Sequence, residues 1–141
     1  MAKINKNITD TLDIVCHSMG YAYALGMIDA IKQQKNVKIP FGRFYIIAPE
    51  DAGAGNVNLS DWQEVWQYGS NENADPLDKQ DGVAPQTRCG NLLESQRAYI
   101  PDIDGAGNHI PKGFISSHSI ENYKWIFKLT KDANGYVTPR Q

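Results

Sequence analysis

A serine, an aspartate and a histidine occur in that order along the chain, in settings that suit nucleophilic chemistry. Ser18 stands in the string Cys16-His17-Ser18-Met19-Gly20, between a short apolar run and an alanine-rich stretch. A serine hydroxyl attacks poorly unless a histidine takes its proton and an acid orients that histidine. If Ser18 is a nucleophile, the rest of the chain must supply both partners.

Two histidines follow Ser18 and are candidates for the base. His118 lies between a loop and the last expected helix, whereas His109 follows the glycine-rich run Gly105-Ala106-Gly107. Both settings suit a catalytic loop. The sequence around them leaves either one available to Ser18.

Three aspartates lie close together in a long polar stretch and are candidates for the acid. They are Asp75, Asp78 and Asp81. Asp81 precedes Gly82, so an ordinary Asp-Gly turn is the alternative interpretation of that pair. A polar stretch of this length is unusual in a compact domain, and such loops often carry function.

The elements around these residues alternate between strands and helices. Residues 12–17 form a short apolar run that predicts a buried strand, and residues 19–34 favour a helix by composition and spacing. We expect further strands at 43–48, 62–68 and 97–103, a short helix within 86–95 and a last helix at 119–130. This order predicts one α/β domain over residues 1–141, with a mostly parallel sheet of about four strands flanked by helices.

The strand, Ser18, Gly20 and the following helix resemble the nucleophile elbow of the α/β-hydrolases, and the string His-Ser-Met-Gly is similar to that of lipases and related esterases. The usual pattern is G-x-S-x-G, and Cys16 stands here in place of its first glycine. A serine that merely caps the helix is the alternative. We expect His17 to point to the opposite side of the strand from Ser18.

This resemblance implies a serine hydrolase that cleaves carboxylic esters, possibly of lipids, through an acyl-enzyme and without metal or cofactor. It favours His118 over His109 as the base, because the family's base sits before the last helix. The string that begins with Asp81 is similar to the D-G-V-V-P string that often carries the family's acid, and Asp75 is the next candidate. The backbone N–H of Met19 would stabilise the oxyanion.

The resemblance extends over most of this sequence but only over part of the family's domain, which has several strands before the elbow. We therefore expect a partial α/β-hydrolase fold without the N-terminal strands. A sheet of this kind has an unpaired edge beside the elbow strand, which predicts self-association or a partner chain. The alternative function is a truncated or degenerate module that binds without catalysis.

The composition limits the other classes of function. The formal net charge is −2, so no basic excess suggests nucleic acid. No apolar run approaches the roughly 20 residues that span a bilayer. Cys16 and Cys89 match no metal-binding spacing, and Cys16 is expected to be a buried small side chain. Residues 1–10 lack a secretory core, which indicates a cytoplasmic location if Met1 is the true start.

Overall fold

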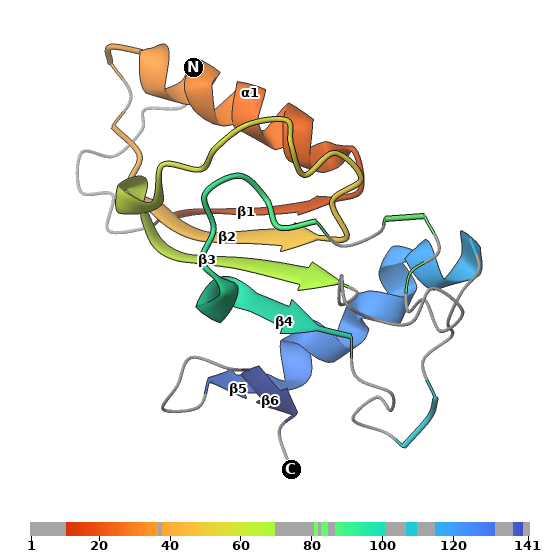
Figure 1. The fold of residues 1–141 in the computed structure, drawn as a ribbon. Helices are drawn as coiled ribbons and strands as arrows, with labels where there is room; N and C mark the ends of the chain where they lie inside the picture. Colours follow the sequence, from red (N-terminus) through yellow and green to blue (C-terminus); the bar gives the residue numbers. More distant parts are fainter. Residues whose placement is uncertain are drawn as a thin grey trace, which may run out of the picture.

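The computed structural model contains a four-stranded sheet in which every neighbouring pair of strands is parallel (Figure 1). The structure describes residues 11–36, 38–69, 81, 83–84, 87–100, 107–109, 115–131 and 137–139. The strands follow one another across the sheet in chain order: β1 (Leu12–His17), β2 (Phe41–Ile47), β3 (Trp62–Gly69) and β4 (Arg97–Tyr99). The predicted α/β class, with a parallel sheet of about four strands, is confirmed.

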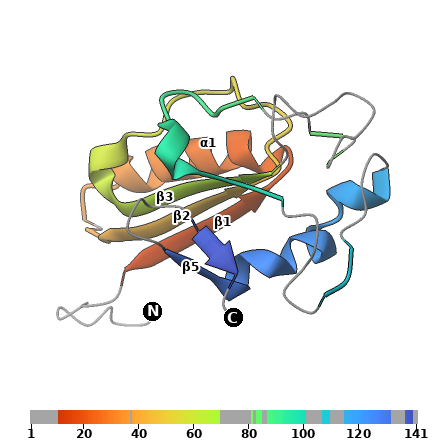
Figure 2. The same ribbon diagram turned by 60° about the horizontal axis from the view of Figure 1, so that its bottom comes forward.

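Helices cover both faces of this sheet, as the view in Figure 2 shows. The α-helix α1 (Gly20–Gln33) lies on one face and buries Tyr21, Ala24 and Ile28. The 3₁₀-helix η4 (Ile120–Lys128) lies on the other. Because side chains alternate along a strand, the two central strands β2 and β3 each contribute to two separate cores.

The two cores follow this alternation along β2. Phe44 and Ile46 pack in the core under α1, together with Ile14 and Cys16 of β1. Ile47 packs in the second core, which contains three buried residues of η4. These three are Tyr123, Trp125 and Ile126. Burial of both faces explains why β2 reads as a nearly continuous apolar run.

The remaining described elements are short. They are the 3₁₀-helices η1 (Leu59–Asp61), η2 (Glu94–Gln96) and η3 (Ile115–His118), and the antiparallel pair β5 (Leu129–Lys131) and β6 (Val137–Pro139). Cys16 and Cys89 are both buried free thiols, which confirms the expectation for Cys16. Burial raises the pKa of each thiol to about 12.

The predicted elements differ from the observed ones mainly in the second half of the chain. The short helix expected within 86–95 is reduced to the turn η2, and β4 ends at Tyr99, whereas the prediction extended to residue 103. Residues 101–103 lie outside the described part of the chain. The last helix is a 3₁₀-helix followed by β5. Its buried residues are Tyr123, Trp125 and Ile126.

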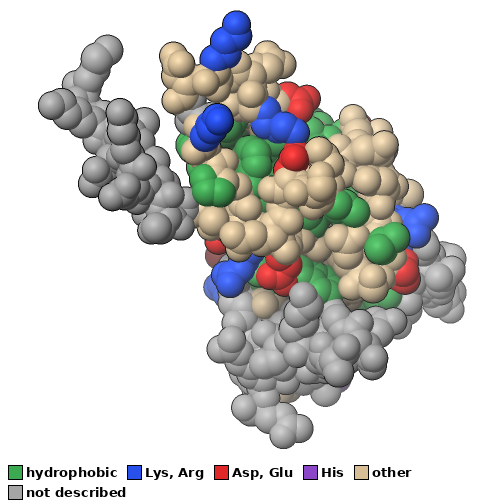
Figure 3. All heavy atoms as spheres, turned by 90° about the vertical axis from the view of Figure 1, so that its left-hand side faces the viewer, with side chains coloured by type: hydrophobic (Ala, Val, Ile, Leu, Met, Phe, Trp, Pro, Cys, Tyr) green, Lys and Arg blue, Asp and Glu red, His purple; other side chains and the backbone are tan. Residues whose placement is uncertain are grey.

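The surface at the amino ends of the strands mixes charges of both signs with apolar side chains. Figure 3 views the molecule from this side and shows lysine, arginine, aspartate and glutamate side chains among hydrophobic ones. The described residues therefore form no continuous basic patch on this face. Within the described ranges, no helix combines the length and the apolar character needed to span a membrane.

Candidate active site

The three residues expected to react lie together at the carboxyl edge of the sheet. Ser18 follows β1, Asp81 lies on the chain after β3, and His118 is the last residue of η3. His118 thereby contacts Ser18, which lies 100 positions earlier in the chain, and Asp81, which lies 37 positions earlier, through hydrogen bonds. In α/β folds this edge is where ligands bind, because the strands end there and their loops surround the space.

The turn between β1 and α1 holds Ser18 in a strained conformation. Its φ is 59°, in the left-handed region that L-residues other than glycine seldom adopt. Backbone hydrogen bonds hold it there: its N–H donates to the carbonyl of Ile47 at 3.0 Å, and its own carbonyl accepts from Glu50 at 3.3 Å. Strain of this kind persists only where the surroundings over-determine it, and it concentrates at functional sites.

Cys16, which departs from the usual glycine of the elbow pattern, fits this turn. A Cβ added at Gly20 would lie 3.6 Å from the Cβ of Cys16, an ordinary van der Waals distance. The strand and the helix therefore approach each other without a clash. Met19 is the N-cap of α1, and no side chain caps this helix end. The structure therefore contradicts the alternative in which Ser18 only caps the helix.

The Ser18 hydroxyl, the His118 imidazole and the Asp81 carboxylate form a continuous hydrogen-bonded chain. Ser18 Oγ lies 2.8 Å from His118 Nε2. His118 Nδ1 lies 2.9 Å from Asp81 Oδ2 and 3.2 Å from Oδ1. An imidazole in this position accepts a proton from the hydroxyl on one side, while the carboxylate holds the other nitrogen protonated.

The Asp81 carboxylate is buried, and several donors keep it charged. Burial alone would raise its pKa, but hydrogen bonds from the Ala84 N–H, the Tyr123 hydroxyl, His118 and the Val83 N–H lower the pKa below its usual value. The two backbone N–H groups bind Oδ1 at 2.9 Å, and the Tyr123 hydroxyl donates to Oδ2 at 2.6 Å. The backbone of Val83 and Ala84 therefore helps to hold the Asp81 carboxylate in place.

Tyr123 is one of the site residues that the sequence did not reveal. Burial, followed by its bond to Asp81, raises the pKa of its hydroxyl, so it remains a donor. On an expected helix its aromatic ring is typical of a core residue, and the ring does pack in the core. Only its hydroxyl reaches the site.

His17 is a second residue that contacts the site contrary to expectation. Its Nε2 lies 2.8 Å from the His118 carbonyl oxygen, and the two rings are 4.6 Å apart. Burial, and then the neighbouring His118, lower the pKa of His17, which favours a neutral ring that donates to this carbonyl. The left-handed turn at Ser18 ends the strand's alternation, and the His17 ring binds the backbone carbonyl of His118.

Glu50 is the third residue that the sequence did not reveal. Its Oε2 lies 3.1 Å from Ser18 Oγ, on the exposed side of the site. Ser18 has a single hydroxyl hydrogen and cannot donate to Glu50 and to His118 Nε2 at once. The hydroxyl therefore donates to one of the two acceptors at a time.

Of the alternative candidates, the structure describes only His109. His109 is exposed and takes no part in the hydrogen bonds that join Ser18, His118 and Asp81. Asp75 and Asp78 lie outside the described residues. Among the described residues, no group of three or more histidine, cysteine, aspartate or glutamate side chains is placed to hold a metal ion.

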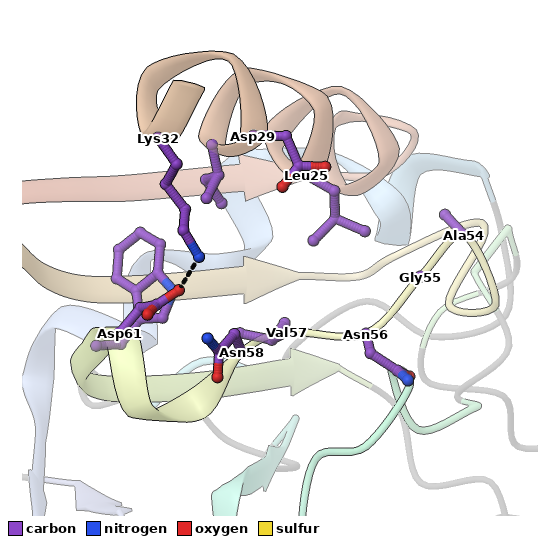
Figure 4. Close-up of a pocket in the computed structure, with 11 residues that line it drawn as sticks. Leu25, Asp29, Lys32, Ala54, Gly55, Asn56, Val57, Asn58 and Asp61 are labelled. Carbon is purple, nitrogen blue, oxygen red and sulfur yellow. Dashed lines mark hydrogen bonds and ion pairs between the residues drawn. The ribbon is translucent and has the colours of Figure 1, made fainter. Parts of the chain in front are cut away.

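A pocket of about 250 Å³ lies away from this site, between α1 and the segment that leads into β3 (Figure 4). Leu25 and Asp29 of α1 line one side, and Asn56 and Asn58 the other. Lys32 and Asp61 form an ion pair across it. Because Ser18, Asp81 and His118 are not among its lining residues, this pocket does not belong to the candidate active site.

Searches against protein-family models, curated proteins and solved structures find no match to this chain. Any function therefore has to be argued from the geometry and chemistry of the residues themselves.

Proposed function

We propose that this protein is a serine hydrolase that cleaves carboxylic esters through an acyl-enzyme. The observation that carries the proposal is the chain of hydrogen bonds from Ser18 Oγ through His118 to the buried carboxylate of Asp81. A strained serine, an imidazole within proton-transfer distance and a charged carboxylate are the parts that acyl transfer needs. The resemblance of the turn to an α/β-hydrolase elbow supports the same activity.

In the first step, Ser18 Oγ bonds to the acyl carbon of the ester while its proton passes to His118 Nε2. The charge of Asp81 stabilises the imidazolium that forms. The tetrahedral intermediate then collapses, the bond from carbon to the alkoxy oxygen breaks, and His118 returns the proton to the departing alcohol. Ser18 is left as an ester of the acyl group.

In the second step, a water molecule attacks the acyl carbon while His118 Nε2 takes one of its protons. The bond between the acyl carbon and Ser18 Oγ breaks, the proton passes to Oγ, and the carboxylic acid leaves. In both steps negative charge develops on the carbonyl oxygen. The Met19 N–H, at the amino end of α1, is the donor proposed to stabilise it.

The test is covalent labelling of Ser18 with a fluorophosphonate probe, in which Oγ attacks phosphorus and displaces fluoride. We expect the label on Ser18, found by peptide mass spectrometry, and ester hydrolysis that Ser18→Ala reduces by about 10⁴–10⁶. Ser60→Ala is the matched control, since Ser60 is exposed in η1 and bonds only to Asn58 among the contacts described. If the folded protein takes no label, the hydrolase proposal is wrong and a non-catalytic binding module is favoured.

A further inference from the structure

We propose that Glu50 makes this site prefer esters whose acyl group carries a positive charge next to the carbonyl carbon. This proposal rests on the proposed function of Ser18. Its basis is the contact of 3.1 Å between Glu50 Oε2 and the oxygen that would become acylated. A carboxylate at that distance faces the substituents of the acyl carbon directly.

The backbone between β2 and Glu50 is shaped to place this carboxylate. Ala48 has a φ of 43°, the other left-handed residue besides Ser18 among the described non-glycine residues. Its N–H donates to the carbonyl of Tyr68 at 2.8 Å, and the next residue, Pro49, is fully buried. The Glu50 N–H then donates to the Ser18 carbonyl. Two strained turns are thus joined by a hydrogen bond, and a strained conformation that is held in this way points to function.

The Glu50 carboxylate is exposed and has no lysine or arginine partner among the ion pairs between described residues. In the free protein the Ser18 hydroxyl lies within hydrogen-bond distance of this carboxylate. In the acyl-enzyme that oxygen has become an ester oxygen and carries no hydrogen. Acylation therefore removes the hydroxyl group that lies beside Glu50.

A protonated amine on the carbon next to the acyl carbon takes the place of that hydroxyl group. It is separated from Ser18 Oγ by only two carbon atoms, so it falls within ion-pair range of Glu50 Oε2. A neutral acyl group leaves the carboxylate without this partner, and an anionic group is repelled by it. The oxyanion is directed away from Glu50, toward the Met19 N–H, for the same electrostatic reason.

The experiment compares ethyl esters of matched shape, with hydrolysis followed by titration of the acid released. Glycine ethyl ester carries an ammonium where ethyl propanoate carries a methyl group, and monoethyl malonate carries a carboxylate. The measured quantity is the ratio of kcat/KM for the cationic ester to that for the neutral one, at a pH at which the amine is protonated. The intrinsic reactivity of each ester cancels when this ratio is compared between variants.

We expect Glu50→Gln to lower that ratio about threefold to fivefold, the upper part of the range for an ion pair that stays open to water. Glu50→Lys should shift the preference toward monoethyl malonate. Asp51→Asn is the matched control, because Asp51 is an adjacent exposed carboxylate that makes no described bond to Ser18. We expect it to change the ratio by less than twofold.

The outcomes separate this proposal from the one on which it rests. If Ser18 takes the fluorophosphonate label but Glu50→Gln leaves the ratio unchanged, or Asp51→Asn lowers it equally, the role of Glu50 is wrong and the hydrolase proposal stands. If the wild-type protein neither takes the label nor hydrolyses any of the three esters, both proposals fail. A loss of the cationic preference confined to the Glu50 variants supports both.

Discussion

Tyr123 joins the candidate site to the hydrophobic core, because its ring packs in the core beneath the sheet while its hydroxyl binds Asp81. The hydrogen bonds that the Asp81 carboxylate accepts hold the pKa of Asp81 below the usual value. A carboxyl group whose folded-state pKa is depressed stabilises the fold above its unfolded pKa of about 3.9. That contribution is lost as the pH falls through the folded-state pKa.

Tyr123→Phe therefore has a predictable effect on stability. The variant keeps the ring but loses a hydrogen bond to a charged acceptor, so we expect it to be about 1.5–3 kcal/mol less stable than the wild type at pH 7. The difference should shrink below about pH 4 as Asp81 takes up a proton. Urea unfolding at several pH values measures this. Tyr23→Phe, at an exposed position of α1, is the control. A difference that stays constant from pH 7 to pH 3 would contradict the prediction.

At the scale of single residues, the sequence identified the groups with distinctive neighbours and missed those without. Ser18, Asp81 and His118 each stand in a recognisable string, and the structure brings them together. The position of Glu50 could have indicated a site residue, because Glu50 follows β2 at the same edge of the sheet where Ser18 follows β1. Tyr123 had none, since a buried tyrosine looks the same whether or not its hydroxyl binds a carboxylate.

At the scale of elements, the junction of β1 and α1 determines where Ser18 lies. The short apolar run predicted the strand, and the composition and spacing predicted the helix, both to within one residue. The left-handed conformation of Ser18 was not predicted by periodicity, because it depends on hydrogen bonds to Ile47 and Glu50. The last helix differed because local propensity does not distinguish a 3₁₀-helix from an α-helix.

The strain at this junction is measurable. Ser18→Ala keeps a Cβ in the left-handed region, at a cost of roughly 1–2 kcal/mol, whereas Ser18→Gly does not. Glycine is in turn destabilising by roughly 0.5–1 kcal/mol relative to alanine, because it gives the unfolded chain more conformational entropy. We therefore expect Ser18→Gly to be more stable than Ser18→Ala by about 1 kcal/mol in urea unfolding, although both lack the hydroxyl.

The same pair of substitutions at Ser60 provides the control. Ser60 lies in η1, and its φ is not positive. There the glycine variant should be the less stable of the two. If alanine is preferred at both positions, the turn at Ser18 does not store strain.

At the scale of the whole molecule, β1 pairs with β2 on one side only within the described part of the chain. The Leu12 N–H donates to the carbonyl of Pro40, just before β2, and the Ser18 N–H donates to the carbonyl of Ile47 in β2. Because successive N–H groups of a strand point to opposite sides, the N–H groups of Asp13, Val15 and His17 point to the outer edge of the sheet. Val15 is also 55% exposed, which is high for a valine in a parallel sheet.

An unpaired, partly apolar edge is a template for another strand. We predict that two copies of this chain associate through β1, related by a two-fold axis that makes the new strand pair antiparallel and both halves of the contact equivalent. Two four-stranded sheets would then form one continuous sheet. The contact lies next to Ser18 in each copy, so association would also restrict access to the candidate site from this side.

Val15→Pro tests this association because proline removes the outward N–H without disturbing the bonds to β2, and an edge strand tolerates it. We expect a dimer for the wild type and for Val15→Ala, which keeps the N–H, and a monomer for Val15→Pro, by light scattering coupled to size exclusion at several protein concentrations. Circular dichroism checks that the variants are folded, and Val15→Lys supplies a second, less intrusive disruption of the edge. A wild-type protein that remains monomeric at every concentration would show that the edge is covered in another way, and a proline variant that still dimerises would place the contact elsewhere.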